Sequence, residues 1–222
     1  MDLAPRTGLA KLSGTMTERY HSPRRADAAA ATRAEILARA QELFFERGYD
    51  GATVPEIARA ARVAPQTVYA SVGGKAAMFV ELLQPAISDP TAIEAMLAAL
   101  ATDDPARVMA LCAKGARSGQ ERYWDLVYKL MRRPPDDVLA QQAIDNIMSK
   151  CLESLTGIAE HLKGLNALRT DLDVAQAVDV LWFYFGQNAW ASLVGERGWT
   201  FDRAEEWLRA AAARELLRTA GD

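Results

Sequence analysis

Apolar residues recur at helical spacing along most of the chain, and we find no convincing run of alternating β-branched residues that would predict a strand. The pattern is clearest where Val54, Ile57, Ala58 and Ala61 fall at the i, i+3, i+4 and i+7 positions of one helix face. Alanine is abundant, and glycine and proline are sparse outside the breaks between apolar runs. The sequence therefore predicts an all-α protein.

The first short helix within residues 53–72 has a well-marked start. Thr53 and Glu56 have the spacing of a capping box, in which the hydroxyl accepts from an N–H three residues on and the carboxylate accepts from the N–H of the cap residue. Pro55 falls in the first turn, where a missing N–H costs nothing. We expect this helix to end at or just before Arg62.

A second short helix follows after a tight break. Pro65 again suits a first turn, and Val68 points inward. Two such helices have the size of a helix-turn-helix, the unit that holds one helix away from a small core so that it can enter a DNA groove. The outward side of the second helix carries side chains that can meet phosphates and base edges, namely Gln66, Thr67 and Tyr69, together with Ala70.

Further helices are predicted on both sides of this pair. Thr32 and Glu35 have capping-box spacing, and Gly48 sits where a left-handed C-terminal residue belongs. After the pair, the glycines at 73–74 break the pattern and Lys75 opens another helix. A lysine at a helix N-terminus adds its charge to free N–H groups and to the positive end of the dipole, so we predict a phosphate contact there.

On these motifs, residues 32–83 resemble the DNA-binding domain of the TetR family of bacterial transcriptional regulators. The family usually has glycine where Arg62 stands, so either Arg62 is left-handed, at a cost of about 1 kcal/mol, or the turn differs. The family often has an aromatic residue where Val72 stands, and valine keeps that contact apolar. The matching residues, in order, are Ile36, Leu37, Leu43, Phe44, Gly48, Tyr49, Thr53, Val54, Ile57, Ala58, Ala61, Val63, Thr67, Val68, Tyr69, Lys75 and Phe79.

The resemblance implies a sequence-specific transcriptional regulator, most often a repressor in this family. Such a protein binds a palindromic double-stranded DNA operator as a homodimer, and we expect a small, largely apolar effector to release it. Glutamine can pair bidentately with adenine, so Gln66 is the best candidate for a base contact, and the other polar groups should mainly hold phosphates. The predicted DNA-binding residues are Thr53, Pro65, Gln66, Thr67, Tyr69, Ala70 and Lys75.

Two other functions are compatible with the same pattern. One is an activator or global DNA-binding protein with the same fold. The other is a ligand-binding helical bundle whose helix-turn-helix no longer reads specific DNA, a hypothesis to which the non-glycine turn at Arg62 gives weight.

The chain divides into three predicted parts, which are a flexible N-terminal arm (1–30), a helix-turn-helix DNA-binding domain (31–84) and an effector-binding and dimerisation domain (85–222). Arg19, Arg24 and Arg25 in the arm either face solvent or reach DNA beside the main contact. Residues 1–84 hold 11 Lys and Arg against 9 Asp and Glu, while residues 85–222 hold 15 against 20. A mild positive bias is expected of the part that touches phosphates.

Two helices are predicted near the C-terminus, over residues 174–194 and 200–218. The first is apolar on most of its sides, and such a helix must be covered on most sides. Two helices of this kind can pair with the same two of a second copy, so we expect a homodimer with a four-helix interface. The stretch from Ala175 to Leu217 also resembles the C-terminal part of a TetR subgroup common in actinobacteria.

A small-molecule site is predicted between the helices of the C-terminal domain, because helix bundles build mostly apolar sites there. In TetR-like proteins this region is the effector pocket. For each residue taken singly, an ordinary place in the core is the alternative. The residues predicted to line the pocket are Tyr123, Trp124, Tyr128, Met131, Met148, Cys151, Leu152, Trp182 and Tyr184.

Catalytic, metal and membrane functions find little support in the sequence. His21 and His161 have no His or Cys at ligand spacing, and the motifs for phosphate loops, dinucleotides and nucleophile elbows are missing, so we predict no enzyme activity and no cofactor. Cys112 and Cys151 lie in apolar helical contexts and are expected to be buried free thiols. No apolar run reaches about 18 residues and no signal peptide is recognisable, so we expect a cytoplasmic protein that spans no membrane.

Overall fold

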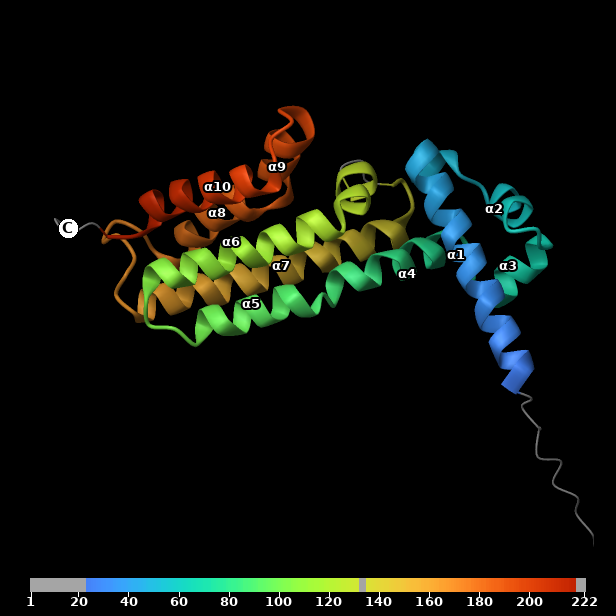
Figure 1. Ribbon diagram of the computed structural model, residues 1–222, viewed down its shortest axis with the longest axis horizontal. Coiled ribbons are helices and arrows are strands. Elements are labelled where there is room, and N and C mark those ends of the chain that lie inside the picture. The colour runs from blue at the N-terminus through green and yellow to red at the C-terminus, as the bar shows by residue number, and fades with distance from the viewer. Residues whose placement is uncertain (1–22, 132–134, 219–222) are drawn as a thin grey trace, which may run out of the picture.

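The computed structural model describes residues 23–131 and 135–218, and over these residues it confirms the all-α prediction (Figure 1). Extended backbone pairs in this part of the chain only at an isolated antiparallel bridge between Leu168 and Leu217. The elements in chain order are α1 (Pro23–Gly51), α2 (Val54–Ala60), α3 (Pro65–Ser71), α4 (Lys75–Ile87), α5 (Pro90–Leu100), α6 (Pro105–Arg122), the π-helical η1 (Leu126–Met131), α7 (Val138–Gly164), α8 (Val174–Phe185), α9 (Gln187–Trp190), the π-helical η2 (Ala191–Glu196) and α10 (Phe201–Leu216).

A small domain at one end of the molecule consists of α1, α2 and α3, with α4 completing its core (Figure 1). Each of these four helices contributes a fully buried side chain, which are Phe44, Ile57, Val68 and Phe79 in turn. The rings of Phe44 and Phe79 meet edge to face, with their centroids 6.2 Å apart. Burial of these side chains is the main term that holds α2 and α3 against α1.

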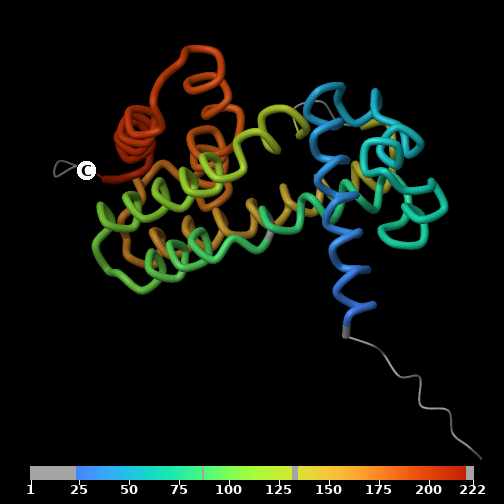
Figure 2. Tube along the Cα trace, turned by 45° about the vertical axis from the view of Figure 1, so that its right-hand side comes forward, coloured from blue at the N-terminus to red at the C-terminus, as the bar shows by residue number. Residues whose placement is uncertain are grey.

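Helix α4 connects the small domain with the larger helical bundle. It packs against α1 at one end and against α7 in the bundle, and Figures 1 and 2 both show it leading from one part into the other. A movement of α4 within the bundle would therefore move the small domain as well.

The bundle is built from α5, α6 and α7, with α8 and α10 packed over α6 and α7 (Figure 2). The bundle has a core cluster of its own, which contains the fully buried Met109, Ile158, Leu162, Leu181 and Leu208. Residues of η1 and of the first turns of α7, such as Leu130 and Ile144, belong instead to the core of the small domain. Across the described residues, no helix is both long and apolar enough to cross a lipid bilayer.

The arm predicted over residues 1–30 is helical from Pro23 onward, which corrects that part of the prediction. Alanine has the highest helix propensity, and the alanines at 28–31 favour continuation of α1 toward the N-terminus. Thr32 lies inside the helix and its hydroxyl donates to the Ala28 carbonyl at 2.9 Å, so the predicted capping box with Glu35 is wrong.

The two ends of α1 carry residues from two different predictions, the basic N-terminal arm and the left-handed glycine. Arg24 and Arg25 lie in the exposed first turn, which projects beyond the small domain in Figure 1. Arg19 and His21 fall outside the described residues. At the other end, Gly48 has the predicted left-handed backbone, with φ 75°.

The apolar helix predicted over residues 174–194 is interrupted, which corrects its length. α8 ends at Phe185, and Gly186 is extended with ψ 162° before α9 and η2 continue the chain. A side chain at position 186 would collide with the carbonyl oxygen of Trp182, so glycine is what permits this break. The final helix agrees better with its prediction, because Thr200 caps α10 and accepts from the Arg203 N–H at 3.2 Å.

Candidate DNA interface and effector cavity

The capping box predicted for the first helix of the helix-turn-helix is present. Thr53 Oγ1 accepts from the Glu56 N–H at 3.4 Å, and Glu56 Oε2 accepts from the Thr53 N–H at 3.1 Å. Glu56 also accepts from the Thr53 hydroxyl at 2.7 Å and pairs with Arg47 at 2.8 Å. The Thr53 hydroxyl, more than Arg47, lowers the pKa of Glu56. The N-terminus of α2 is therefore firmly fixed, with Pro55 in its first turn.

The turn between α2 and α3 runs through Arg62, whose φ of 56° is left-handed. Of the two alternatives for this non-glycine position, the molecule thus adopts the strained one, at a cost of about 1 kcal/mol. The Val63 N–H donates to the Ala58 carbonyl at 2.9 Å and the Arg62 N–H donates to that of Arg59 at 3.2 Å. These bonds close the C-terminal end of α2 and keep the turn short.

Helix α3 is anchored by one fully buried side chain, Val68. Tyr69 is 59% exposed although it is a large aromatic residue. The side chains that the sequence places on the outer face are all exposed, namely Pro65, Gln66, Thr67, Tyr69 and Ala70. The structure therefore brings the predicted contact residues of α3 together on one open face.

Lys75 lies at the N-terminus of α4, and its ammonium group contacts Tyr49 at the end of α1. Nζ donates to the Tyr49 carbonyl oxygen at 3.0 Å and stands 4.2 Å from the centroid of the Tyr49 ring. A cation over an aromatic face contributes about 0.5–1 kcal/mol at exposed sites. Lys75 thus joins α4 to α1, and one of its three ammonium donors is already engaged.

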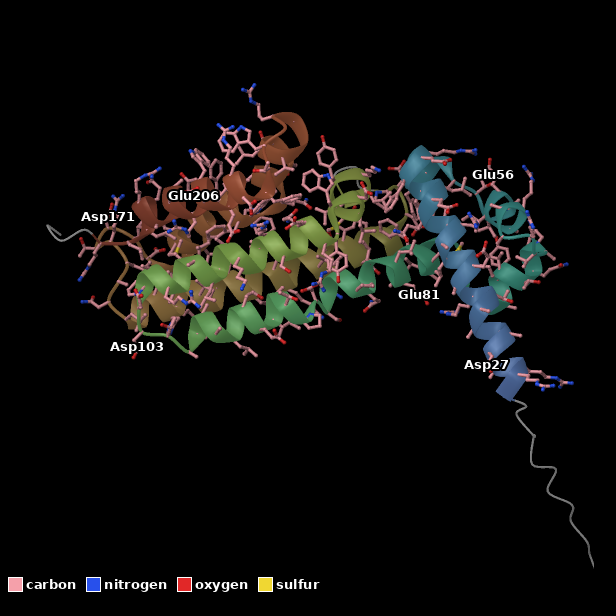
Figure 3. All side chains as sticks on the ribbon, viewed as in Figure 1. Asp27, Glu56, Glu81, Asp103, Asp171 and Glu206 are labelled. Atoms are coloured by element: carbon pink, nitrogen blue, oxygen red, sulfur yellow. The ribbon has the colours of Figure 1, made fainter. Side chains whose placement is uncertain are left out.

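Arg33 on α1 holds α3 and α4 together, a role that the sequence reasoning missed. Its guanidinium donates to both carboxylate oxygens of Glu81 on α4, at 3.1 and 2.5 Å, and to the carbonyl oxygen of Ser71 at the end of α3. Figure 3 labels Glu81 where α4 passes α1. Nothing in the local sequence pattern signals a pair 48 residues apart, so only the fold could reveal it.

Tyr49 also faces the bundle, where Asp137 caps the N-terminus of α7. Burial, and after it the neighbouring Asp137 carboxylate, raises the pKa of the Tyr49 hydroxyl. Asp137 Oδ1 accepts the N–H groups of Leu139 and Ala140 at 3.0 and 3.1 Å. The Ala140 N–H contributes most to lowering the pKa of Asp137, with Tyr49 and Lys75 adding to it. Tyr49, Lys75 and Asp137 together form a polar junction between the two domains.

The bundle surrounds a cavity of about 260 Å³. Its walls come from α5, α6, α7 and the end of α8, and they extend to Ala86 in α4 and to Met131 in η1. Burial raises the pKa of the Cys112 thiol, which lies in this wall, to about 12, so this thiol stays protonated and uncharged. The cavity therefore borders the same helix, α4, that completes the core of the small domain.

The structure brings together at this cavity only part of the set of pocket residues predicted from sequence. Trp124 and Tyr128 instead stack on each other, with their centroids 4.8 Å apart. Leu152 is exposed, and Tyr184 packs against Phe183. Cys151 borders the cavity but is exposed, which corrects its prediction as a buried thiol. The predicted residues in the wall are Tyr123, Met131, Met148, Cys151 and Trp182.

Asp89, a buried charged residue of the cavity wall, was missed by sequence reasoning. Asp89 is 2% exposed, caps α5 by accepting the Ala92 N–H at 2.9 Å, and also contacts the Tyr123 hydroxyl at 3.1 Å and Arg122 at 3.2 Å. Burial, then the Asp89 carboxylate, raises the pKa of Tyr123. The Asp-Pro pair before a helical run is a start signal that could have identified Asp89 as a cap, although not its place in a cavity.

Two glutamines of the cavity wall were also missed by sequence reasoning. Gln120 comes from the end of α6, and Gln187 follows the break at Gly186. The Oε1 atom of each is buried and has no hydrogen-bond partner. Native proteins leave few such atoms unsatisfied, so both oxygens call for a partner that the chain itself does not supply.

Four aromatic side chains on α8, on α10 and just before α10 form a partly exposed surface, which we call the aromatic face and define as Phe183, Tyr184, Trp199 and Trp207. Phe183 is 71% exposed and Trp207 is 47% exposed. Phe183 packs against Tyr184 at 5.1 Å between centroids, and Trp199 against Trp207 at 6.0 Å. Exposed large aromatic residues gathered in this way are typical of interaction surfaces.

The arrangement defines a class of protein, a helix-turn-helix DNA-binding domain joined by one helix to a hollow helical bundle. Comparisons with known proteins agree with this class. Residues 36–82 match the model of the family described as bacterial regulatory proteins of the tetR family. No curated protein sequence matches the chain.

Solved structures of TetR-type regulators share the fold over most of the chain. NalD, the secondary repressor of the MexAB-OprM multidrug efflux pump in Pseudomonas aeruginosa, is 25% identical with a TM-score of 0.70, covering 86% of this chain and 98% of its own. FadR from Bacillus subtilis in complex with stearoyl-CoA is 19% identical with a TM-score of 0.64, covering 82% and 98%. PfmR from Thermus thermophilus is 23% identical with a TM-score of 0.59, covering 83% and 96%.

The chain therefore carries a tetR-type helix-turn-helix domain at residues 36–82, followed by a larger helical domain, and its whole fold is similar to that of solved TetR-type regulators.

Proposed function

We propose that this regulator is a homodimeric repressor that binds a palindromic operator and is released by a small, largely apolar effector. The open face of α3 supports this proposal most directly, because its side chains are exposed while Val68 alone is fully buried. A short helix held in this way fits a major groove, and two copies would enter successive grooves about 34–36 Å apart. The name of NalD as a repressor supports repression.

Gln66 is proposed to contact a base edge, while Thr67 and Tyr69 hold phosphates. Each of the three side chains is exposed on α3. Pro65 and Ala70 shape the contact surface, and they carry no donor of their own on their side chains. Thr53 is proposed to add a phosphate contact, for which its hydroxyl must turn away from Glu56.

Lys75 is proposed to give a phosphate one of the ammonium donors that Tyr49 does not engage. Lys75→Ala should then weaken binding to all duplexes alike and lower the slope of log affinity against log salt by about one. A lower unfolding temperature with an unchanged salt slope would confine Lys75 to the contact with Tyr49.

Dimerisation is proposed to bury the aromatic face of α8 and α10 against the same face of a second copy. An isologous pairing of this kind covers Phe183 and Trp207 in both copies at once. Phe183→Glu should then shift the protein to monomers in sedimentation, and it should weaken operator binding because two linked half-sites become one. A monomeric wild-type protein at micromolar concentration would contradict the proposal.

The effector is proposed to act through α4, which borders the cavity at Ala86 and is held to α1 and α3 through Glu81 and Arg33. A ligand that shifts α4 changes the spacing of the two recognition helices. Such coupling typically amounts to about 1–3 kcal/mol and is reciprocal, so DNA must weaken effector binding by the same factor.

Selection of duplexes from a random pool with the purified protein tests the central proposal. We expect enrichment of a sequence with two half-sites related by a two-fold axis, and protection of both half-sites in footprinting. A reporter placed behind that sequence then separates repression from activation. Because the target is chromosomal DNA, the protein is proposed to act in the cytoplasm. Enrichment of no duplex would instead favour a bundle that no longer reads DNA.

A further inference from the structure

We infer that the effector of this cavity is a small, uncharged, mainly apolar molecule that donates an N–H or O–H group to the carboxamide oxygens of Gln120 and Gln187. The inference rests on the proposed function, because it names the class of ligand for the same cavity.

Two carboxamide oxygens in the cavity wall need a hydrogen-bond donor. Gln120 Oε1 and Gln187 Oε1 are both buried without a partner, and both residues belong to the wall of the one cavity. An amide oxygen removed from water without a hydrogen bond is unfavourable. A ligand donor that reaches these oxygens, or that replaces a water there, makes the bond that the chain leaves open.

The charges of the cavity wall disfavour an anionic ligand. Asp89 places a buried carboxylate at the cavity, and the guanidinium of Arg122 is already engaged with it at 3.2 Å. Among the described residues of the wall, the single cation is Lys150, which is exposed. A ligand carboxylate or phosphate would lie near the Asp89 charge without a free buried cation. The stearoyl-CoA of the FadR complex is therefore a poor guide to this ligand.

The same carboxylate also offers little to a cationic ligand. One Asp89 oxygen accepts from the Ala92 N–H at 2.9 Å, and the other from the Tyr123 hydroxyl at 3.1 Å and from Arg122. An ammonium group would have to replace Arg122 to be paired. The open acceptors are the neutral carboxamides, so an uncharged donor matches them best.

The size and the lining of the cavity indicate a small ligand with one or two rings. The cavity volume of about 260 Å³ lies just below the roughly 300–1,000 Å³ of sites for drug-sized molecules, which indicates a small ligand. Aromatic side chains from Tyr123, Trp182 and Phe185 form part of the wall. A Cβ added to Gly119 would meet no atom within 4 Å, so this glycine leaves open space in the wall. A molecule of one or two rings with a single donor fits this description.

Three matched probes test the inference on the full-length protein by calorimetry, namely 2-naphthol, 2-methoxynaphthalene and 2-naphthoate. They share a ring system and differ in carrying a donor, no donor or an anionic group. We expect 2-naphthol to bind roughly tenfold more tightly than 2-methoxynaphthalene, which is the order of one hydrogen bond, and 2-naphthoate to bind more weakly than both.

Variants locate the effect. The double variant Gln120→Leu with Gln187→Leu should bind 2-naphthol and 2-methoxynaphthalene equally, and it should unfold at a higher temperature because two unsatisfied oxygens are removed. Gln142→Leu on the exposed side of α7, outside the cavity wall, is the matched control and should keep the preference. Gly119→Leu should fill the space and weaken all three probes.

Operator affinity, measured on each variant without probe, separates this inference from the proposed function. Equal binding of 2-naphthol and 2-methoxynaphthalene by the wild type, tighter binding of 2-naphthoate, or binding of none of the three overturns the ligand class while operator binding stands. A preference that survives in the double variant also overturns it. If the wild type binds no selected duplex, the proposed function fails, whatever the probes show.

Discussion

The DNA-binding domain and the bundle are both built from α-helices, but the first has a filled core and the second contains a cavity. In the DNA-binding domain, Phe44, Ile57, Val68 and Phe79 are fully buried in one continuous core. In the bundle, Ile147 belongs to the edge of the same cluster but also borders a cavity of about 260 Å³. A helix that reads DNA must keep its position, so its support is filled, whereas a sensor needs an unfilled space whose occupation changes its energy. Helix α4 belongs to both regions, so in the proposed function it would pass a change at the cavity on to the DNA-binding domain.

Two isoleucine variants test most directly whether the two regions differ in packing. Ile57→Ala in the filled core should destabilise the protein by about 4 kcal/mol, because it removes buried surface and leaves a new void. Ile147→Ala in the cavity wall should cost about 2 kcal/mol, since one side of this residue already lacks packing partners. Urea unfolding of both variants measures the difference, and equal losses would show that the bundle is packed as tightly as the other domain.

Two glutamines distinguish the regions by function. Gln66→Ala on the exposed face of α3 should reduce discrimination at one operator position by about 1–3 kcal/mol and leave probe binding unchanged. Gln187→Leu in the cavity wall should weaken the binding of 2-naphthol and leave operator affinity unchanged. Affinity for the selected operator and for single-base variants of it measures the first effect. A uniform loss on every duplex would instead assign Gln66 to a phosphate.

The helix-turn-helix could be predicted from sequence because its signals are local. Thr53, Pro55 and Glu56 lie within one turn of the helix that they start, and the structure has the contacts expected of them. The strained turn at Arg62 was one of two stated alternatives, and its φ of 56° decides between them. The helical start at Pro23 was missed, because the Gly, Ser and Pro residues before it suggest a tail while the alanines at 28–31 favour helix.

The cavity could be predicted only in part, because its polar groups depend on contacts between distant segments. Asp89 meets Tyr123, 34 residues away, through the packing of α5 on α6. Gln187 joins the wall because the chain breaks at Gly186, and apolar periodicity continues through that position without a sign of it. Aromatic residues such as Trp124 and Tyr128 have the composition of a pocket, yet they stack on each other outside it. Residue type alone does not tell which side of a helix faces empty space.

A pair of charges joins α1 to α4, the helix that connects the two regions. Glu81→Gln removes the carboxylate that receives both donors of Arg33, so it should destabilise the protein by about 1 kcal/mol and lower operator affinity several-fold by loosening the end of α3. Glu42→Gln is the matched control, because Glu42 pairs with Arg39 within α1 alone. It should cost at most about 0.5 kcal/mol and leave operator affinity unchanged. Equal effects of the two variants would show that the Arg33–Glu81 pair does not contribute to coupling between the cavity and the DNA-binding domain.

The smallest expected effect belongs to the cap of α2 and appears as a dependence on pH. The pKa of Glu56 in the folded protein lies below its ordinary value of 4.5, chiefly because its carboxylate accepts from the Thr53 hydroxyl. A lowered pKa means that the charged form stabilises the fold above pH 4.5 and that this contribution is lost as the pH falls through the folded pKa. Glu56→Gln keeps a side chain that can complete the capping box but cannot titrate. The difference in unfolding temperature between wild type and variant should therefore shrink from about pH 6 to about pH 3, and a difference that stays constant would show that the charge of Glu56 does not contribute to holding the helix that supports α3.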